Sequence, residues 1–117
     1  MASTGHTFPK AERISGVKDV AALLAGGKWM RSELLKACYM RNGLEFSRIV
    51  VSVPKRLFKR AVKRNLLKRR IREAYRLQKE LLAEGGFDIL LQYNSPEVAE
   101  FQAVKQDVAG VLQRISQ

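Results

Sequence analysis

The sequence predicts a small single-domain α+β sandwich of order α-β-β-β-α-β-α, in which helices, one of them long and basic, cover a mixed four-stranded sheet. Three observations lead to this class. The chain has 117 residues, 46% of them hydrophobic, which suits one core and leaves little room for a second domain. Hydrophobic residues alternate in some segments and follow helical spacing in others. No segment repeats.

The first elements are a helix and an edge strand. Hydrophobic residues recur at helical spacing over residues 17–24, and Gly26-Gly27 ends this amphipathic helix. A short extended segment over residues 28–32 predicts a strand at the edge of the sheet.

Two longer strands follow. Residues 34–40 favour a strand, and residues 48–53 alternate between hydrophobic and polar or smaller side chains. Asn42-Gly43 between them is typical of a tight hairpin turn. We therefore expect these two strands to pair as antiparallel neighbours. Pro54 ends the second of them because proline has no N–H to donate.

The basic helix is predicted over residues 61–83. A hydrophobic stripe of helical period runs along it, with Lys and Arg on its flanks and back. At 1.5 Å per residue its length would be ~35 Å. Gly85-Gly86 is expected to terminate it.

A last strand and a last helix complete the order. Residues 87–93 alternate, which places Asp88 and Gln92 on the outward face. Ser95-Pro96-Glu97 has the composition of a helix start: a capping serine, proline at the first helical position and an acid in the first turn. The final amphipathic helix is expected from there to Ile115.

Positive charge is concentrated in one segment. The sequence has 22 Lys and Arg against 11 Asp and Glu, a net charge of +11. Twelve basic residues lie between Lys55 and Lys79, where Glu73 is the only acid, and the rest of the chain sums to zero. Like charges four residues apart, such as Lys68 and Arg72, repel and do not stabilise a helix. The segment therefore indicates a polyanionic partner, and nucleic acid is the usual one.

Few residues suggest a catalytic or metal site within the chain. His6 is the only histidine and lies near the polar N-terminus. Cys38 is the only cysteine, has no neighbouring histidine to activate it, and is expected to be a small buried residue. Glu73 is expected to pair with a basic residue of its own helix, Arg69, Arg70 or Arg76. We expect no catalytic residue and no metal ligand.

The basic helix would bind phosphates, and other side chains would add contacts to bases or sugars. Neutralising six to eight phosphates would give a log–log salt slope of about −4 to −7. Asn65 suits hydrogen bonds to bases or sugars. Four aromatic residues either stack on unpaired bases or belong to the core: Phe8, Tyr39, Phe46 and Tyr93.

The segment around this helix resembles the bacterial ribonuclease P protein component. That family carries Arg-Asn-Arg, an apolar residue, Lys-Arg, and then Arg-Glu after two further positions. Residues 64–73 here are Arg-Asn-Leu-Leu-Lys-Arg-Arg-Ile-Arg-Glu. Residues 52–56, Ser-Val-Pro-Lys-Arg, are similar to the family's Ser-Val-Ser-Lys-Lys. Leu66 and Pro54 stand where the family has arginine and serine.

The resemblance implies a function in tRNA processing. In that family a catalytic RNA subunit cleaves precursor tRNA at the mature 5′ end with RNA-bound Mg²⁺, and the protein binds no cofactor or small molecule itself. The protein is the non-catalytic subunit of this ribonucleoprotein endoribonuclease. It binds the catalytic RNA and holds the single-stranded 5′ leader of precursor tRNA in a cleft between helix and sheet.

The resemblance and the charge cluster together give the expected site. The RNA contacts are Lys55, Arg56, Lys59, Arg60, Lys63, Arg64, Asn65, Lys68, Arg69 and Arg72. Arg13 and Tyr39 are expected in the leader cleft.

The remaining expectations concern the ends of the chain and its location. Residues 1–9 predict a flexible N-terminal arm, and residues 10–117 a single RNA-binding domain. No apolar run is long enough to cross a bilayer, and the start lacks the features of a secretory signal. One cysteine excludes an intramolecular disulfide. We therefore expect a cytoplasmic chain with no membrane partner.

Three other functions fit parts of the pattern. A ribosomal-protein-like RNA-binding module without a role in cleavage would use the same basic helix. An amphipathic basic helix also binds anionic membrane surfaces, although a stripe that covers a sheet leaves little apolar surface to insert. A self-sufficient nuclease would cleave RNA without an added RNA subunit.

Overall fold

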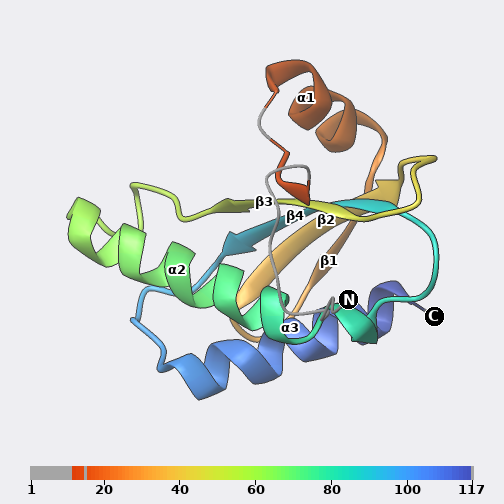
Figure 1. The fold of residues 1–117 in the computed structure, drawn as a ribbon. Coiled ribbons are helices and arrows are strands. Elements are labelled where there is room, and N and C mark those ends of the chain that lie inside the picture. Colours follow the sequence, from red (N-terminus) through yellow and green to blue (C-terminus); the bar gives the residue numbers. More distant parts are fainter. Residues whose placement is uncertain (1–11, 15, 117) are drawn as a thin grey trace.

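A computed structural model describes residues 12–14 and 16–116 as a four-stranded sheet between helices (Figure 1). The elements follow the predicted order and confirm the predicted α+β class. They are α1 (Val17–Gly26), β1 (Lys28–Arg31), β2 (Leu35–Arg41), β3 (Arg48–Ser52), α2 (Ala61–Leu77), a short 3-10 turn (Lys79–Leu81), β4 (Phe87–Tyr93) and α3 (Phe101–Ile115). The arm predicted over residues 1–9 lies outside the described residues.

The strand order is β1-β2-β4-β3, so the predicted hairpin between β2 and β3 is wrong. The last strand, β4, lies between them, antiparallel to β2 and parallel to β3. All residues of β4 except Gln92 are buried, which favours a central position. The connection from β2 to β3 instead crosses the end of β4 (Figure 1), and the Asn42 side chain donates to Asp88 of β4.

Helices cover both faces of the sheet. The helices α2 and α3 lie against one face, and α1 lies over part of the other (Figure 1). The main core lies under α2 and α3, while a smaller cluster under α1 contains Ile14, Leu23, Cys38 and Leu90. Asp88 therefore does not face water as its alternation predicts, and only 2% of it is exposed.

The basic helix is shorter than predicted. It ends at Leu77 instead of continuing to residue 83, and its 17 residues span ~26 Å. Gln78 leaves the helical conformation, and its side-chain amide donates to Ala74 O of α2 and to Lys105 O of α3. This tertiary contact between two helices replaces the next helical turn.

The last helix begins later than predicted. It starts at Phe101, whereas Ser95-Pro96-Glu97 is not helical. The buried Tyr93 hydroxyl donates to Glu97 O and accepts from Ala99 N. These bonds satisfy backbone groups that a helix would otherwise pair.

Two glycines are expected to respond oppositely to alanine substitution. A Cβ on buried Gly86 would overlap Asn42 Oδ1, Phe46 O and Leu44 O, so G86A is expected to lose about 1–3 kcal/mol of unfolding free energy. Gly110, inside α3, has open space around the same position, and G110A is expected to gain about 0.5–1 kcal/mol. Urea denaturation measures both values, and equal effects would contradict the described packing.

Candidate nucleic-acid interface

The hydrophobic stripe of α2 fixes which sides of this helix face solvent. Leu67, Ile71, Ala74 and Tyr75 are buried against the core. The basic positions fall between and opposite these residues. Lys63, Arg69 and Arg72 are exposed, and Asn65 is exposed among them. Packing of the apolar side therefore presents the charged sides to water.

The cations of this segment are largely unneutralised by the chain itself. Ten basic residues form no ion pair within the described part of the chain: Lys55, Arg56, Lys59, Arg60, Lys63, Arg64, Lys68, Arg69, Arg70 and Arg72. We call these ten residues the α2 cation cluster. All ten are at least partly exposed. They come from α2 and from the loop that precedes it.

Two members of the cluster also support the fold. One Arg64 nitrogen, Nη1, donates to Phe58 O and Lys59 O, both at 2.8 Å. Phe58 is buried and contacts Tyr93 with ring centroids 5.9 Å apart, so the loop before α2 is anchored on both sides. The guanidinium of Arg70 donates to Ala99 O in the segment before α3. Arg64 and Arg70 therefore position the loop and the helix as well as adding charge.

The start of α2 adds a partial positive charge to this surface. Its N-cap is Arg60, which makes no side-chain capping bond. The first backbone bond of the helix runs from Arg64 N to Arg60 O, so the N–H groups of residues 61–63 have no helical acceptor. The helix dipole and these N–H groups favour an anion close to the loop cations.

Acids neutralise the other end of the segment. Arg76 donates two hydrogen bonds to Glu73, which lower the pKa of the Glu73 carboxyl and confirm its predicted pairing within the helix. Lys79 Nζ lies 2.9 Å from Glu12. Unneutralised charge therefore gathers over the loop and the first three turns of α2.

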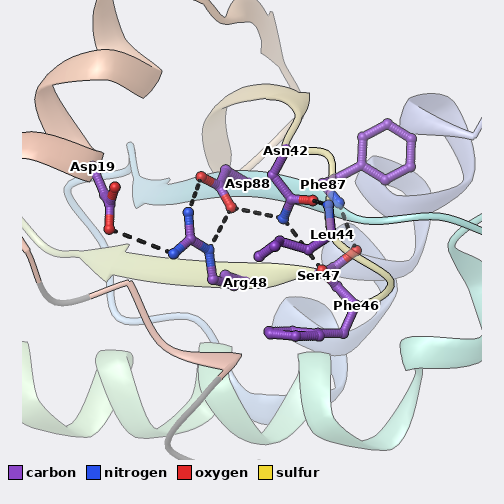
Figure 2. Close-up of polar contacts among 8 residues, drawn as sticks. All are labelled: Asp19, Asn42, Leu44, Phe46, Ser47, Arg48, Phe87 and Asp88. Carbon is purple, nitrogen blue, oxygen red and sulfur yellow. Dashed lines mark hydrogen bonds and ion pairs between the residues drawn. The ribbon is translucent and has the colours of Figure 1, made fainter.

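An ion pair with a buried carboxylate lies on the face of the sheet that α1 partly covers (Figure 2). Arg48 donates to both oxygens of Asp88, at 2.9 and 2.7 Å, and Asn42 Nδ2 donates to Asp88 Oδ1 at 2.9 Å. Asp19 of α1 lies 3.4 Å from Arg48, so the network also reaches α1. Asp88 raises the pKa of the Arg48 guanidinium through these hydrogen bonds. The network ties β4, β3, α1 and the β2–β3 connection together.

The two residues expected in a leader cleft lie apart. Arg13 is bridged to Ile49 of β3, at one edge of the sheet. Tyr39 is in β2, with β4 between β2 and β3. Its side chain packs against the main core and lines a cavity of about 320 Å³ with Lys28 and Arg41. Arg13 is not among the residues that line this cavity.

The other candidate residues divide into core and surface. Tyr93 is fully buried and Phe46 is exposed, whereas His6 and Phe8 lie outside the described residues. Cys38 is buried, as predicted, and burial raises the pKa of its thiol. Among the described residues no group of three or more His, Cys, Asp or Glu could hold a metal ion. No described helix has the length and hydropathy of a membrane span.

A mixed sheet covered by helices, with unneutralised cations gathered at the start of one exposed helix, defines an α+β nucleic-acid-binding protein. Comparison with known families makes this more specific, because the model of the family Ribonuclease P matches residues 8–116. The chain belongs to the ribonuclease P protein component family, as the resemblance of its basic segment predicts.

Individual relatives agree in sequence and in fold. The ribonuclease P protein component of Thermotoga maritima is 32% identical over 115 residues, which cover 94% of this chain and 97% of the relative. That of Dictyoglomus turgidum is 43% identical over 79 residues, 68% of this chain and 66% of the relative. The solved structure of the T. maritima RNase P protein superposes with a TM-score of 0.80 at 28% identity, covering 91% of this chain and 99% of the other.

The family settles the class of function. Its members are protein subunits of a ribonucleoprotein endoribonuclease that processes tRNA, which confirms the predicted function. The comparisons do not support the alternative of a ribosomal-protein-like module without a role in cleavage. An RNA partner follows from membership of the family.

Proposed function

We propose that this chain binds the catalytic RNA of ribonuclease P through the α2 cation cluster and assists removal of the 5′ leader from precursor tRNA. The observation that carries the proposal is that ten cations of one segment have no acidic partner in the described part of the chain. A folded protein gains no stability from such an arrangement, because neighbouring like charges repel. Bound phosphates would remove that repulsion.

The members of the cluster would play different parts. The side chains of Lys63, Arg69 and Arg72 are exposed and form no ion pair with another described residue, so they are available to phosphates. Arg64 already donates to two carbonyls and would mainly hold the loop that carries Lys55, Arg56, Lys59 and Arg60. Asn65, exposed between these cations, would donate to a sugar or base.

The chemical step would take place on the RNA. Mg²⁺ bound to the RNA would activate the attacking water, and no residue of this chain is assigned to that step. The chain would screen phosphate repulsion between the catalytic RNA and the precursor. It would do so in the cytoplasm, where we expect both RNAs.

The 5′ leader would lie along the sheet face that α1 partly covers. Leu24 of α1 is 44% exposed, and Val20 and Val50, which pack against the cluster under α1, are only partly buried. A single strand offers unpaired bases, which pack on apolar and aromatic side chains. Arg13 lies at the β3 edge, where it would meet the leader close to the α2 cation cluster, and Tyr39 packs on the side of the sheet that faces α2 and α3.

Reconstituted cleavage tests the proposal. Precursor tRNA would be incubated with a bacterial ribonuclease P RNA at low Mg²⁺, with and without this chain. We expect product with the correct 5′ end in the presence of the chain and little in its absence. Cleavage by the chain without the catalytic RNA, or no stimulation at any Mg²⁺ concentration, would contradict the proposal.

A further inference from the structure

The strand register aligns a polar row across the sheet. Arg31 pairs with Lys36, Lys36 with Gln92, and Gln92 with Ser52, so these four residues run from the β1 edge to the β3 edge. Side chains alternate along a strand, which puts this row on the same face as Cys38, the residue buried beneath α1. Arg31 is exposed and the other three are half-buried. The row therefore lies on the part of the face that remains open to solvent.

Beside this row stands the only tryptophan of the chain. Trp29 of β1 pairs with Cys38, one row nearer to α1, and 46% of it is exposed. Lys36 Nζ lies 4.9 Å from the centroid of its ring. A large exposed aromatic ring next to a cation is the combination that binds a nucleotide: the ring stacks on the base while the cation meets the phosphate.

The charges around Trp29 select an anionic partner. Arg31 and Lys36 are the charged residues of the polar row, and neither forms an ion pair within the described residues. The acids on this face, Asp19 and Asp88, are both bound to Arg48 at the other end of the strands. Glu33, in the β1–β2 turn, is the one exposed acid nearby in sequence.

The row also leads to the α2 cation cluster. Ser52 ends β3, and Lys55 and Arg56 follow within four residues. Three inter-strand spacings of about 4.8 Å separate Arg31 from Ser52, about 14 Å in all. A single-stranded RNA that leaves the α2 cation cluster and passes Ser52 would therefore cross Gln92 and reach Trp29 within a few nucleotides.

We propose that Trp29, Lys36 and Arg31 form a second contact for single-stranded RNA at the β1 edge, where Trp29 stacks on an unpaired base and the two cations bind flanking phosphates. The contact rests on the proposed function in one respect: its natural occupant would be the part of the 5′ leader farthest from the cleavage site. A short leader would not reach it. The chain would thus distinguish precursors by the length of their leaders.

Trp29 reports on its own contact, because it is the only tryptophan. Titrating the full chain with single-stranded oligouridylate is expected to quench its fluorescence saturably, whereas an RNA duplex, whose bases are stacked, is expected to quench it little. W29A is expected to bind labelled oligouridylate about tenfold more weakly and W29F nearly as well as the unchanged chain. L44A, which removes an exposed apolar side chain of the β2–β3 connection, serves as the control and is expected to leave the RNA affinity unchanged.

The reconstituted enzyme gives the second measurement. W29A is expected to raise the KM for a long-leader precursor and to leave a short-leader precursor unaffected. K36A and R31A are expected each to reduce the salt slope of oligouridylate binding by about 0.7. Circular dichroism checks that every variant is folded.

Different results would disprove the proposed function and the β1 contact. Quenching by oligouridylate without stimulated cleavage would remove the proposed function and keep the β1 contact. Stimulated cleavage without quenching would overturn the β1 contact. The same RNA affinity for W29A and L44A would also overturn it, and the exposed tryptophan would then be available to a protein partner.

Discussion

Replacing Arg69 and Arg72 together with alanine is expected to weaken binding of the catalytic RNA about 100-fold at near-physiological salt. Each arginine is exposed and has no acidic partner in the described part of the chain. A hydrogen bond to a charged group contributes at least about 1.5 kcal/mol, so the loss of two such contacts lowers the binding free energy by about 3 kcal/mol. Filter binding at fixed salt measures the change.

The same helix provides a matched control. Arg76 is paired with Glu73, so R76A removes a cation whose charge the chain already neutralises. We expect R76A to change the affinity less than threefold. Arg64 is unsuitable for this test because its loss would also release the carbonyls of Phe58 and Lys59. A loss of binding free energy for R76A that is half that of the double variant or more would show that total charge, and not its placement, determines binding.

Replacing Arg48 with alanine is expected to cost about 3–5 kcal/mol of unfolding free energy. The Asp88 side chain is 3% exposed, and R48A would leave its carboxylate buried without a cationic partner. For a domain of this size such a loss would lower the Tm by well over 10 °C. Thermal and urea unfolding measure it.

The double variant R48A/D88N isolates the cause. Asparagine carries no charge, so the uncompensated buried carboxylate is gone and part of the stability should return. D19A tests the outer partner of Arg48. The Asp19 side chain is 52% exposed, so D19A is expected to cost less than about 1 kcal/mol of unfolding free energy. A loss below about 1 kcal/mol for R48A would contradict the structural importance of this network.

Local sequence patterns predict the elements well and their pairing poorly. The strands over 28–32, 34–40, 48–53 and 87–93 are present within one or two residues. The Asn42-Gly43 hairpin fails because pairing is decided by β4, which is far away in sequence and buried on both faces. The turn signal itself is real: Gly43 has φ of 75°, and Asn42 Oδ1 accepts from Leu44 N.

The helix ends are missed for a related reason. Gln78 ends α2 by donating to Lys105 O of another helix, and the Tyr93 hydroxyl keeps the Ser95–Ala99 segment out of α3. Both side chains act across the fold, and short-range capping rules contain no such partner. Asp88 is a third case, because its carboxylate is bound by Arg48 of β3 and by Asn42 of the β2–β3 connection, and neither partner is visible in the strand alternation.

The candidate site is predicted in part from the sequence. The cluster of cations is visible as a run of Lys and Arg opposed only by Glu73, and the structure brings it together on one loop and one helix. What the run does not show is that Arg64 and Arg70 bind carbonyls and that Arg76 and Lys79 are neutralised. Trp29 and Lys36 are missed because the signal is a cross-strand register, which requires the pairing of β1 with β2.

The salt dependence of catalytic-RNA binding tests most directly whether the α2 cation cluster binds phosphates. For the unchanged chain we predict a log–log slope of about −4 to −7. For R69A/R72A the slope should become less steep by about 1.5 to 2, while R76A leaves it unchanged. A slope near −1 for the unchanged chain, or equal slopes for all three proteins, would contradict the account.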